Sequence, residues 1–188
     1  HIVLELVMPP VEERAADLPN PGLIADVDTA DFNALHALLN KYLESKAFVE
    51  GIMVFRKLAA RATRNGRIYL HLGVLYEAGG YADDAIRALQ TAVQLLPDEE
   101  AGYQLLSGCC LLRRHFELAM TTCREGLKRF PAGHRLHFNL GYALAQRGRH
   151  DEAIAEFQAE LDADPSCSQA KYNMDAVAKR QVATLHLS

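Results

Sequence analysis

The chain has 188 residues, of which 49% are hydrophobic, and a formal net charge of −4. This length accommodates one sizeable domain or one short solenoid. The mild negative charge gives no electrostatic reason to expect a nucleic-acid partner, and no basic run stands out. No apolar stretch approaches the length of about 20 residues that spans a bilayer, so we expect no direct membrane insertion.

Residues 1–25 do not fit the pattern of the rest of the chain. Residues 1–7 (HIVLELV) have the composition of a β-strand, and prolines at 9, 10, 19 and 21 exclude a continuous helix. Three interpretations stay open for this extended or disordered arm. It is a vector-derived stretch before a native start at Met8, a disordered leader, or an arm that docks on the body or on another molecule.

Residues 32–65 predict a first helical hairpin. Asp28 or Thr29 is suited to cap its first helix. That helix has an apolar stripe formed by Leu35, Leu38, Leu39 and Tyr42. After residues 45–46, a second helix carries Gly51, Ile52, Phe55 and Leu58.

Residues 66–99 predict two short helices with a turn at residues 78–82, and this unit recurs downstream. Three series of residues step by 34: Gly73, Ser107 and Gly141; Ala85, Ala119 and Ala153; and Pro97, Pro131 and Pro165. Small residues are needed where helices cross closely. A proline after the second helix stops that helix, because it has no N–H to donate. After Pro165 only one further helix fits.

This 34-residue interval and its residue pattern resemble the tetratricopeptide repeat (TPR) family. The first copy matches at Tyr69, Leu72, Gly73, Tyr76, Ala85, Ala92 and Pro97. The resemblance implies an all-α fold, a right-handed α-α superhelix in which stacked hairpins bury a continuous core. Within a TPR domain of residues 26–188 we expect a divergent repeat at 32–65, regular repeats at 66–99, 100–133 and 134–167, and a capping helix at 168–185. Departures from the pattern stand at Leu39, Thr63, His137 and Glu160.

The resemblance also implies that the first helices of successive repeats line a concave groove that binds a peptide. Carried over by register, the groove residues are Arg67, Leu70, His71, Val74, Gln104, Arg135, Phe138, Asn139, Tyr142, Tyr172 and Asn173. Asparagine amides can pair with a peptide backbone, aromatic side chains offer apolar area, and arginines can hold a carboxylate. The alternative is that these are ordinary residues of a solvated face.

The carboxylate clamp, a sharper motif of the family, is not matched. It needs Lys and Asn where this chain has Leu70 and Val74 in one repeat and Gln104 and Gly108 in the next. Binding of chaperone C-terminal tails is therefore disfavoured.

Catalytic and metal sites are not indicated by the sequence. Gly79 and Gly80 form a turn between helices rather than a phosphate loop, and the pairs at 83–84 and 151–152 place acids at helix starts, where they suit the helix dipole. His134 and His137 share a helix face but lack a third ligand at matching spacing. Arg113 and Arg114 are expected to lie in a solvated turn. We expect no cofactor and no metal.

Four cysteines stand at positions 109, 110, 123 and 167. Their spacing matches neither a disulfide framework nor a CxxC motif. We expect Cys110 and Cys123 to pack in the core as small apolar residues. Free cysteines favour a reducing compartment, so a cytoplasmic location is expected, with a periplasmic or exported location as the alternative if a signal segment was removed.

The function expected from these features is that of a non-catalytic protein–protein interaction scaffold. It would bind a peptide or protein segment in the concave groove as an adaptor, a chaperone-like protein or an assembly factor. The alternative is a self-assembling scaffold, a homo-oligomer held together by the N-terminal arm or the solenoid ends. A third interpretation is a module of a larger protein.

Overall fold

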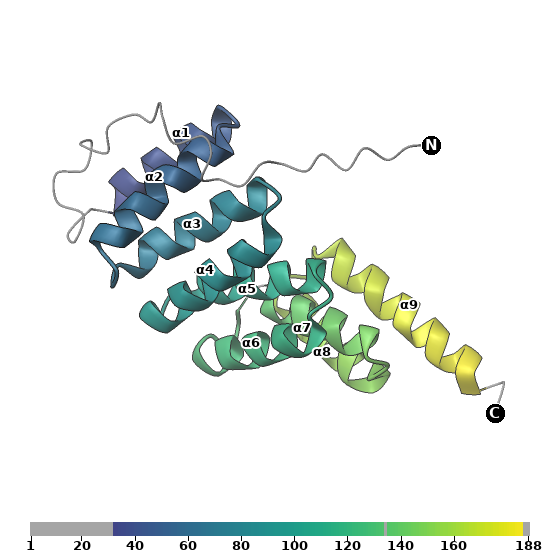
Figure 1. Cartoon of the computed structure of the whole chain (residues 1–188). Helices are drawn as coiled ribbons and strands as arrows, with labels where there is room; N and C mark the ends of the chain where they lie inside the picture. Colours follow the sequence, from purple (N-terminus) through teal and green to yellow (C-terminus); the bar gives the residue numbers. More distant parts are fainter. Residues whose placement is uncertain (1–31, 134, 186–188) are drawn as a thin grey trace, which may run out of the picture.

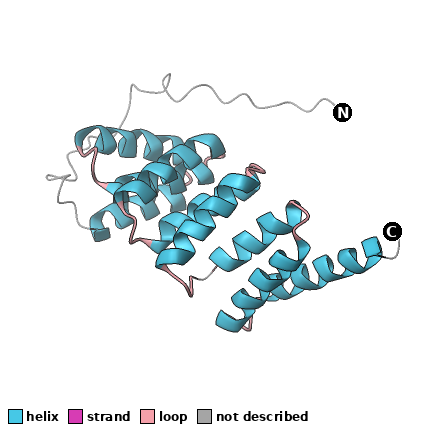
Figure 2. Cartoon of the chain, turned by 90° about the horizontal axis from the view of Figure 1, so that it is seen from below, coloured by secondary structure: helices cyan, strands magenta, loops and turns pink. Residues whose placement is uncertain are grey.

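In the computed structural model, residues 32–133 and 135–185 are described, and every regular element in those ranges is an α-helix (Figures 1 and 2). In chain order these are α1 (Phe32–Glu44), α2 (Phe48–Arg61), α3 (Gly66–Ala78), α4 (Ala82–Leu95), α5 (Glu100–Leu112), α6 (Phe116–Arg129), α7 (Leu136–Gln146), α8 (His150–Ala163) and α9 (Ser168–Leu185). The expected arm at 1–25 and the expected caps Asp28 and Thr29 lie outside the described residues.

The helices form consecutive antiparallel pairs that stack into a solenoid, as the 34-residue step predicts. Each odd-numbered helix contacts the next odd-numbered helix, from α1 with α3 to α7 with α9. Each even-numbered helix contacts the odd-numbered helices before and after it, but no two even-numbered helices in the described part contact each other. The stack is therefore tighter on the odd side. We call the odd-helix side the inner face and the even-helix side the outer face.

The first helix of each hairpin ends in a Schellman motif, which turns the chain into the second helix. One residue adopts the left-handed conformation there, and the next N–H bonds back to the carbonyl five residues earlier, at 2.8–3.1 Å. The left-handed residues are Lys46, Gly80, Arg114 and Gly148, which step by 34. Glycine adopts a positive φ without steric cost, whereas lysine and arginine do not.

Close helix crossings explain the small residues of the repeat. A Cβ added at Gly73 would lie 2.5 Å from Cγ of Leu89, and one at Gly141 would lie 3.0 Å from the ring of Phe157. Ser107, the equivalent residue of the middle repeat, is fully buried. The prediction of small residues at these crossings is confirmed.

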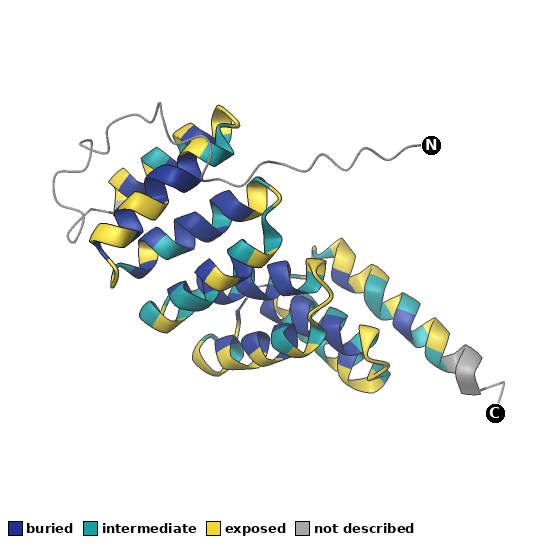
Figure 3. Ribbon diagram, in the orientation of Figure 1, coloured by how far each residue is buried: buried dark blue, intermediate teal, exposed yellow. Residues whose placement is uncertain are grey.

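The core is continuous along the stack, with buried residues on successive helices of both layers (Figure 3). It includes the predicted stripe residues Leu35, Leu39 and Tyr42, and also Cys110 and Cys123. Burial raises the pKa of both thiols to about 12, so they stay protonated and pack as apolar groups, as expected. No helix in the described part is long and apolar enough to cross a bilayer.

Candidate functional site

The residues expected to line the groove lie on the odd-numbered helices, except Arg135, which immediately precedes α7. Helix α3 carries Arg67, Leu70, His71 and Val74; α5 carries Gln104; α7 carries Phe138, Asn139 and Tyr142; and α9 carries Tyr172 and Asn173. They differ in accessibility. Leu70, His71 and Asn139 are buried; Val74, Gln104, Phe138, Tyr142 and Asn173 are half-buried; and Arg67, Arg135 and Tyr172 are exposed. Their role in ligand binding stays a prediction.

His71 lies in the interior where the first hairpin packs on α3. Its side chain is only 3% exposed, and its ring centroid lies 5.8 Å from those of both His36 and Phe55. Nδ1 is 2.6 Å from the carbonyl oxygen of Arg67, to which a ring N–H can donate. Burial lowers the pKa of His71 below its usual value, because the imidazolium is poorly solvated there. In this structure, the residue serves packing.

Asn139 joins α7 to α5 inside the stack. It is 4% exposed, and its amide donates a 2.8 Å hydrogen bond to Oγ of Ser107. The Ser107 hydroxyl in turn donates to the carbonyl of Gln104, at 3.0 Å. A buried amide needs such partners. The Asn139 donor is thus already used within the protein rather than presented to a peptide.

Aromatic residues on α7 and α9 form the accessible part of the predicted set. Tyr172 is 75% exposed, and Tyr142 and Phe138 are half-buried. Phe138 also packs on Phe157 of α8, with ring centroids 5.9 Å apart. Asn173 donates to the carbonyl of Gln169 within α9, at 2.9 Å. Because α7 and α9 are in contact, these side chains belong to one end of the inner face.

Glu160 has a role that its position in the repeat did not reveal. The two carboxylate oxygens accept the backbone N–H of Arg135, each at 3.1 Å, and one of them also accepts the N–H of Phe138 at 3.2 Å. Glu160 is 3% exposed, so this is a buried cap at the start of α7. Arg135 was expected to hold a carboxylate with its guanidinium, but in the structure its backbone binds one. The sequence did give one indication of this role, since Glu160 is an acid at a repeat position that is usually a small residue.

His137, at the aromatic position of its repeat, contacts two acceptors. Its Nδ1 lies 2.8 Å from Glu156 and its Nε2 lies 3.1 Å from the carbonyl of Pro131. His134 is outside the described residues. Within the described part, no group of three or more His, Cys, Asp or Glu side chains is placed to hold a metal ion.

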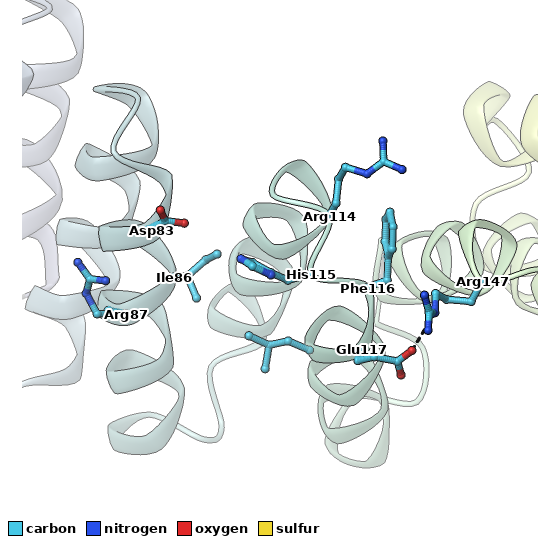
Figure 4. Close-up of a pocket in the computed structure, with 9 residues that line it drawn as sticks. Asp83, Ile86, Arg87, Arg114, His115, Phe116, Glu117 and Arg147 are labelled. Carbon is cyan, nitrogen blue, oxygen red and sulfur yellow. Dashed lines mark ion pairs between the residues drawn. The ribbon is translucent and has the colours of Figure 1, made fainter. Parts of the chain in front are cut away.

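A pocket of about 600 Å³ opens on the outer face between α4 and α6, and we call it the outer pocket (Figure 4). It was not anticipated from the sequence. Its lining comes from α4, from the α5–α6 turn and the start of α6, and from the end of α7: Asp83, Ile86, Arg87, Arg114, His115, Phe116, Glu117, Leu118 and Arg147. In Figure 4, Ile86 of α4 points toward His115, and Phe116 lies beyond His115, next to Arg147.

Ion pairs at this surface connect successive hairpins. Arg113 bonds Asp83 through two guanidinium nitrogens at 3.0 and 3.1 Å, and Arg147 lies 2.9 Å from Glu117. Arg113 and Arg114 are exposed in a turn, as expected. They are not merely solvated, however, since Arg113 pairs with Asp83 and the Arg114 guanidinium lies 5.7 Å from the ring centroid of Phe116.

Comparisons with known proteins agree with this architecture. The chain resembles the crystal structure of MamA (20% identity, TM-score 0.71, covering 76% of this chain and 84% of that one). It also resembles YrrB, whose structure is described as that of a TPR protein with an unusual peptide-binding site (17% identity, TM-score 0.67, 80% and 78% coverage). A third similar structure is the Arabidopsis OM64 TPR domain (19%, 0.59, 61% and 94%).

No curated protein matches the sequence significantly. Two sequence models of the tetratricopeptide repeat match the chain, one at residues 66–99 and the other at residues 113–166. Neither describes a catalytic domain, and proteins built from this repeat are generally non-catalytic interaction scaffolds. These matches, the 34-residue series and the stacked hairpins together show that the chain is a tetratricopeptide repeat protein.

Proposed function

We propose that this protein is a non-catalytic scaffold that binds a peptide or protein segment on its inner face, as an adaptor, a chaperone-like protein or an assembly factor. The observation that carries the proposal is the aromatic group on α7 and α9, above all Tyr172, which is 75% exposed. An exposed aromatic ring supplies a large apolar contact and loses little rotamer entropy on binding. The peptide-binding site described for YrrB, a structurally similar protein, supports the same use of the fold.

The binding residues proposed here are a subset of those expected from the repeat register. Tyr142 and Tyr172 are accessible on neighbouring helices, with Asn173 beside them. Arg67 is exposed on α3 and can contact a more distant part of a ligand. Asn139 is assigned to the internal hydrogen bond with Ser107 and not to ligand binding.

The test is affinity capture from the source lysate by the full chain, with bound proteins identified by mass spectrometry. Three forms are compared: the wild type, the Tyr142→Ala/Tyr172→Ala double variant, and Leu112→Ala. Leu112 is the matched control, since it is a large apolar residue that is 71% exposed elsewhere, at the end of α5. A partner retained by the wild type and the control but lost by the double variant would support the proposal.

With such a partner in hand, the double variant is expected to weaken binding by about 2–4 kcal/mol, the range for two aromatic hot spots. Equal retention by all three forms would refute the inner aromatic surface as the site. Recovery of only the protein itself would favour the alternative, a self-assembling scaffold, and light scattering would then give the number of chains per particle.

A further inference from the structure

The outer pocket follows from the curvature of the stack. Because α4 and α6 do not contact each other, the outer face is open between them, and the α5–α6 turn enters this gap. Ile86 is buried at the α4 side, and Phe116 and Leu118 are half-buried at the α6 side. The pocket therefore has an apolar floor that is accessible from the outer face.

The rim of the pocket carries one positive charge that is not balanced locally. Arg87 pairs with Asp84, Arg113 with Asp83, and Arg147 with Glu117. Arg114 has no carboxylate partner among the described residues, and its guanidinium lies over Phe116 instead. A ligand that brings a carboxylate next to an apolar side chain would match this combination of a free cation and an aromatic ring.

Arg114 also occupies a backbone position that glycine would fill with less strain. Its φ is +60°, and the equivalent residues of the neighbouring hairpins are Gly80 and Gly148. The strain does not itself identify a ligand. It does provide a variant for testing, because Arg114→Gly removes the guanidinium while restoring the residue that this turn favours.

The chain contains a segment of matching chemistry. Residues 1–31 hold seven of the 24 acidic residues but only one of the 20 basic residues, which gives them a net charge of −6 and leaves +2 for residues 32–188. Within this stretch, residues 11–17 (VEERAAD) combine three carboxylates and one arginine, a net charge of −2, with apolar side chains.

We propose that residues 11–17 bind in the outer pocket of the same chain, with a carboxylate at Arg114 and apolar side chains against Phe116 and Ile86. The distance is within reach. From α1 the pocket lies about two hairpins along the stack, or about 20–30 Å at the usual 8–10 Å between packed helices. The 14 residues between 17 and α1 can extend over about 45 Å.

Crosslinking in the full chain tests the location. An Arg114→Lys variant keeps the charge and adds an amine, which a carbodiimide couples to a carboxylate in direct contact. The chain's native lysines, at positions 41, 46, 57, 128, 171 and 179, are internal controls. We expect crosslinks within one chain from Glu12, Glu13 or Asp17 to position 114, in excess over every native lysine, and their loss in high salt. No excess at position 114, or crosslinks only between two copies, would overturn the proposal.

A second readout separates binding from folding. The chain has no tryptophan, so Val11→Trp gives a single fluorophore in the segment. We expect the emission of this tryptophan to be blue-shifted and protected from quenching by acrylamide. Both effects should be lost when Arg114→Gly is added. The control is Lys46→Gly. It likewise removes one positive charge and puts glycine at a left-handed position (φ +55°), but in the turn of the first hairpin. It should leave the emission unchanged. An equal response to both variants, or no protection in the parent, would contradict binding in the outer pocket.

Discussion

The buried carboxylate of Glu160 should be a major contributor to the stability of the hairpin formed by α7 and α8. It accepts the backbone N–H groups of Arg135 and Phe138 at 3.1–3.2 Å, where the positive end of the α7 dipole favours a negative charge. The residue at the N-cap position, Arg135, has a left-handed φ of +65° and makes no side-chain cap of its own. Glu160 therefore takes over a function that a local serine or aspartate usually performs.

The magnitude of a Glu160→Ala change follows from these contacts. A hydrogen bond to a charged acceptor contributes about 1.5–3 kcal/mol, and two N–H groups lose theirs. Arg135 is exposed, so water can replace one of the two bonds, and burial of the carboxylate already has a desolvation cost. We expect a loss of about 2–4 kcal/mol in the free energy of unfolding. Glu160→Gln, which keeps an acceptor oxygen but not the charge, should lose about half as much.

Urea denaturation followed by circular dichroism measures this loss, and exchange of the Phe138 amide reports the cap locally, since stacked repeats need not unfold in one step. Glu125→Ala is the matched control: Glu125 is an exposed acid on α6, and its removal should change stability by less than about 0.5 kcal/mol. If Glu160→Ala had the same urea midpoint as the control and the Phe138 amide stayed protected, the reasoning would be refuted.

Three further predictions concern stability. Burial lowers the pKa of His71 in the folded protein, so as the pH falls this histidine is protonated first in the unfolded chain. The free energy of unfolding should therefore decrease below about pH 6.5, and His71→Gln should flatten the pH dependence of the urea midpoint. Gly73→Ala, whose Cβ would clash with Leu89, should destabilise by about 1–3 kcal/mol, whereas Gly108→Ala, with open space around it, should gain up to about 1 kcal/mol; thermal melts that shift both variants alike would contradict this. Lys46→Gly should raise the melting temperature, because it removes a left-handed lysine that costs about 1 kcal/mol, and an unchanged or lower value would count against strain at this turn.

The repeat architecture could be predicted because its close helix crossings and its turns each restrict which residue can stand at a given position. Gly73 and Gly141 are small since a partner helix leaves no room for a Cβ, and a small residue, Ser107, also stands at the equivalent position of the repeat between them. The Schellman turns were harder to recognise from the sequence. Their left-handed positions also step by 34, but only Gly80 and Gly148 reveal the conformation, whereas Lys46 and Arg114 conceal it.

The accessibility of the predicted groove could not be obtained in the same way. Register places a residue on a helix face, but what covers that face depends on the neighbouring hairpin. His71 faces the first hairpin and is covered by its packing against Phe55 and His36. Asn139 lies opposite Ser107, whose hydroxyl oxygen accepts the amide N–H of Asn139 in the interior. Repeat register does not distinguish these two residues from Tyr172, which has no helix over it in the described part and is 75% exposed.

Departures from the repeat therefore carry more specific information than agreement with it. A residue that fits the pattern needs no explanation beyond packing, because the same contact recurs in each hairpin. A buried acid and a left-handed arginine each have an energetic cost relative to the alanine or glycine found at the equivalent positions. The cost at Glu160 is offset by two backbone N–H groups. At Arg114 the contact with Phe116 is exposed, so the guanidinium stays available for a ligand in the outer pocket. We expect the first departure to stabilise the fold, and the second is the residue on which the proposed binding of residues 11–17 depends.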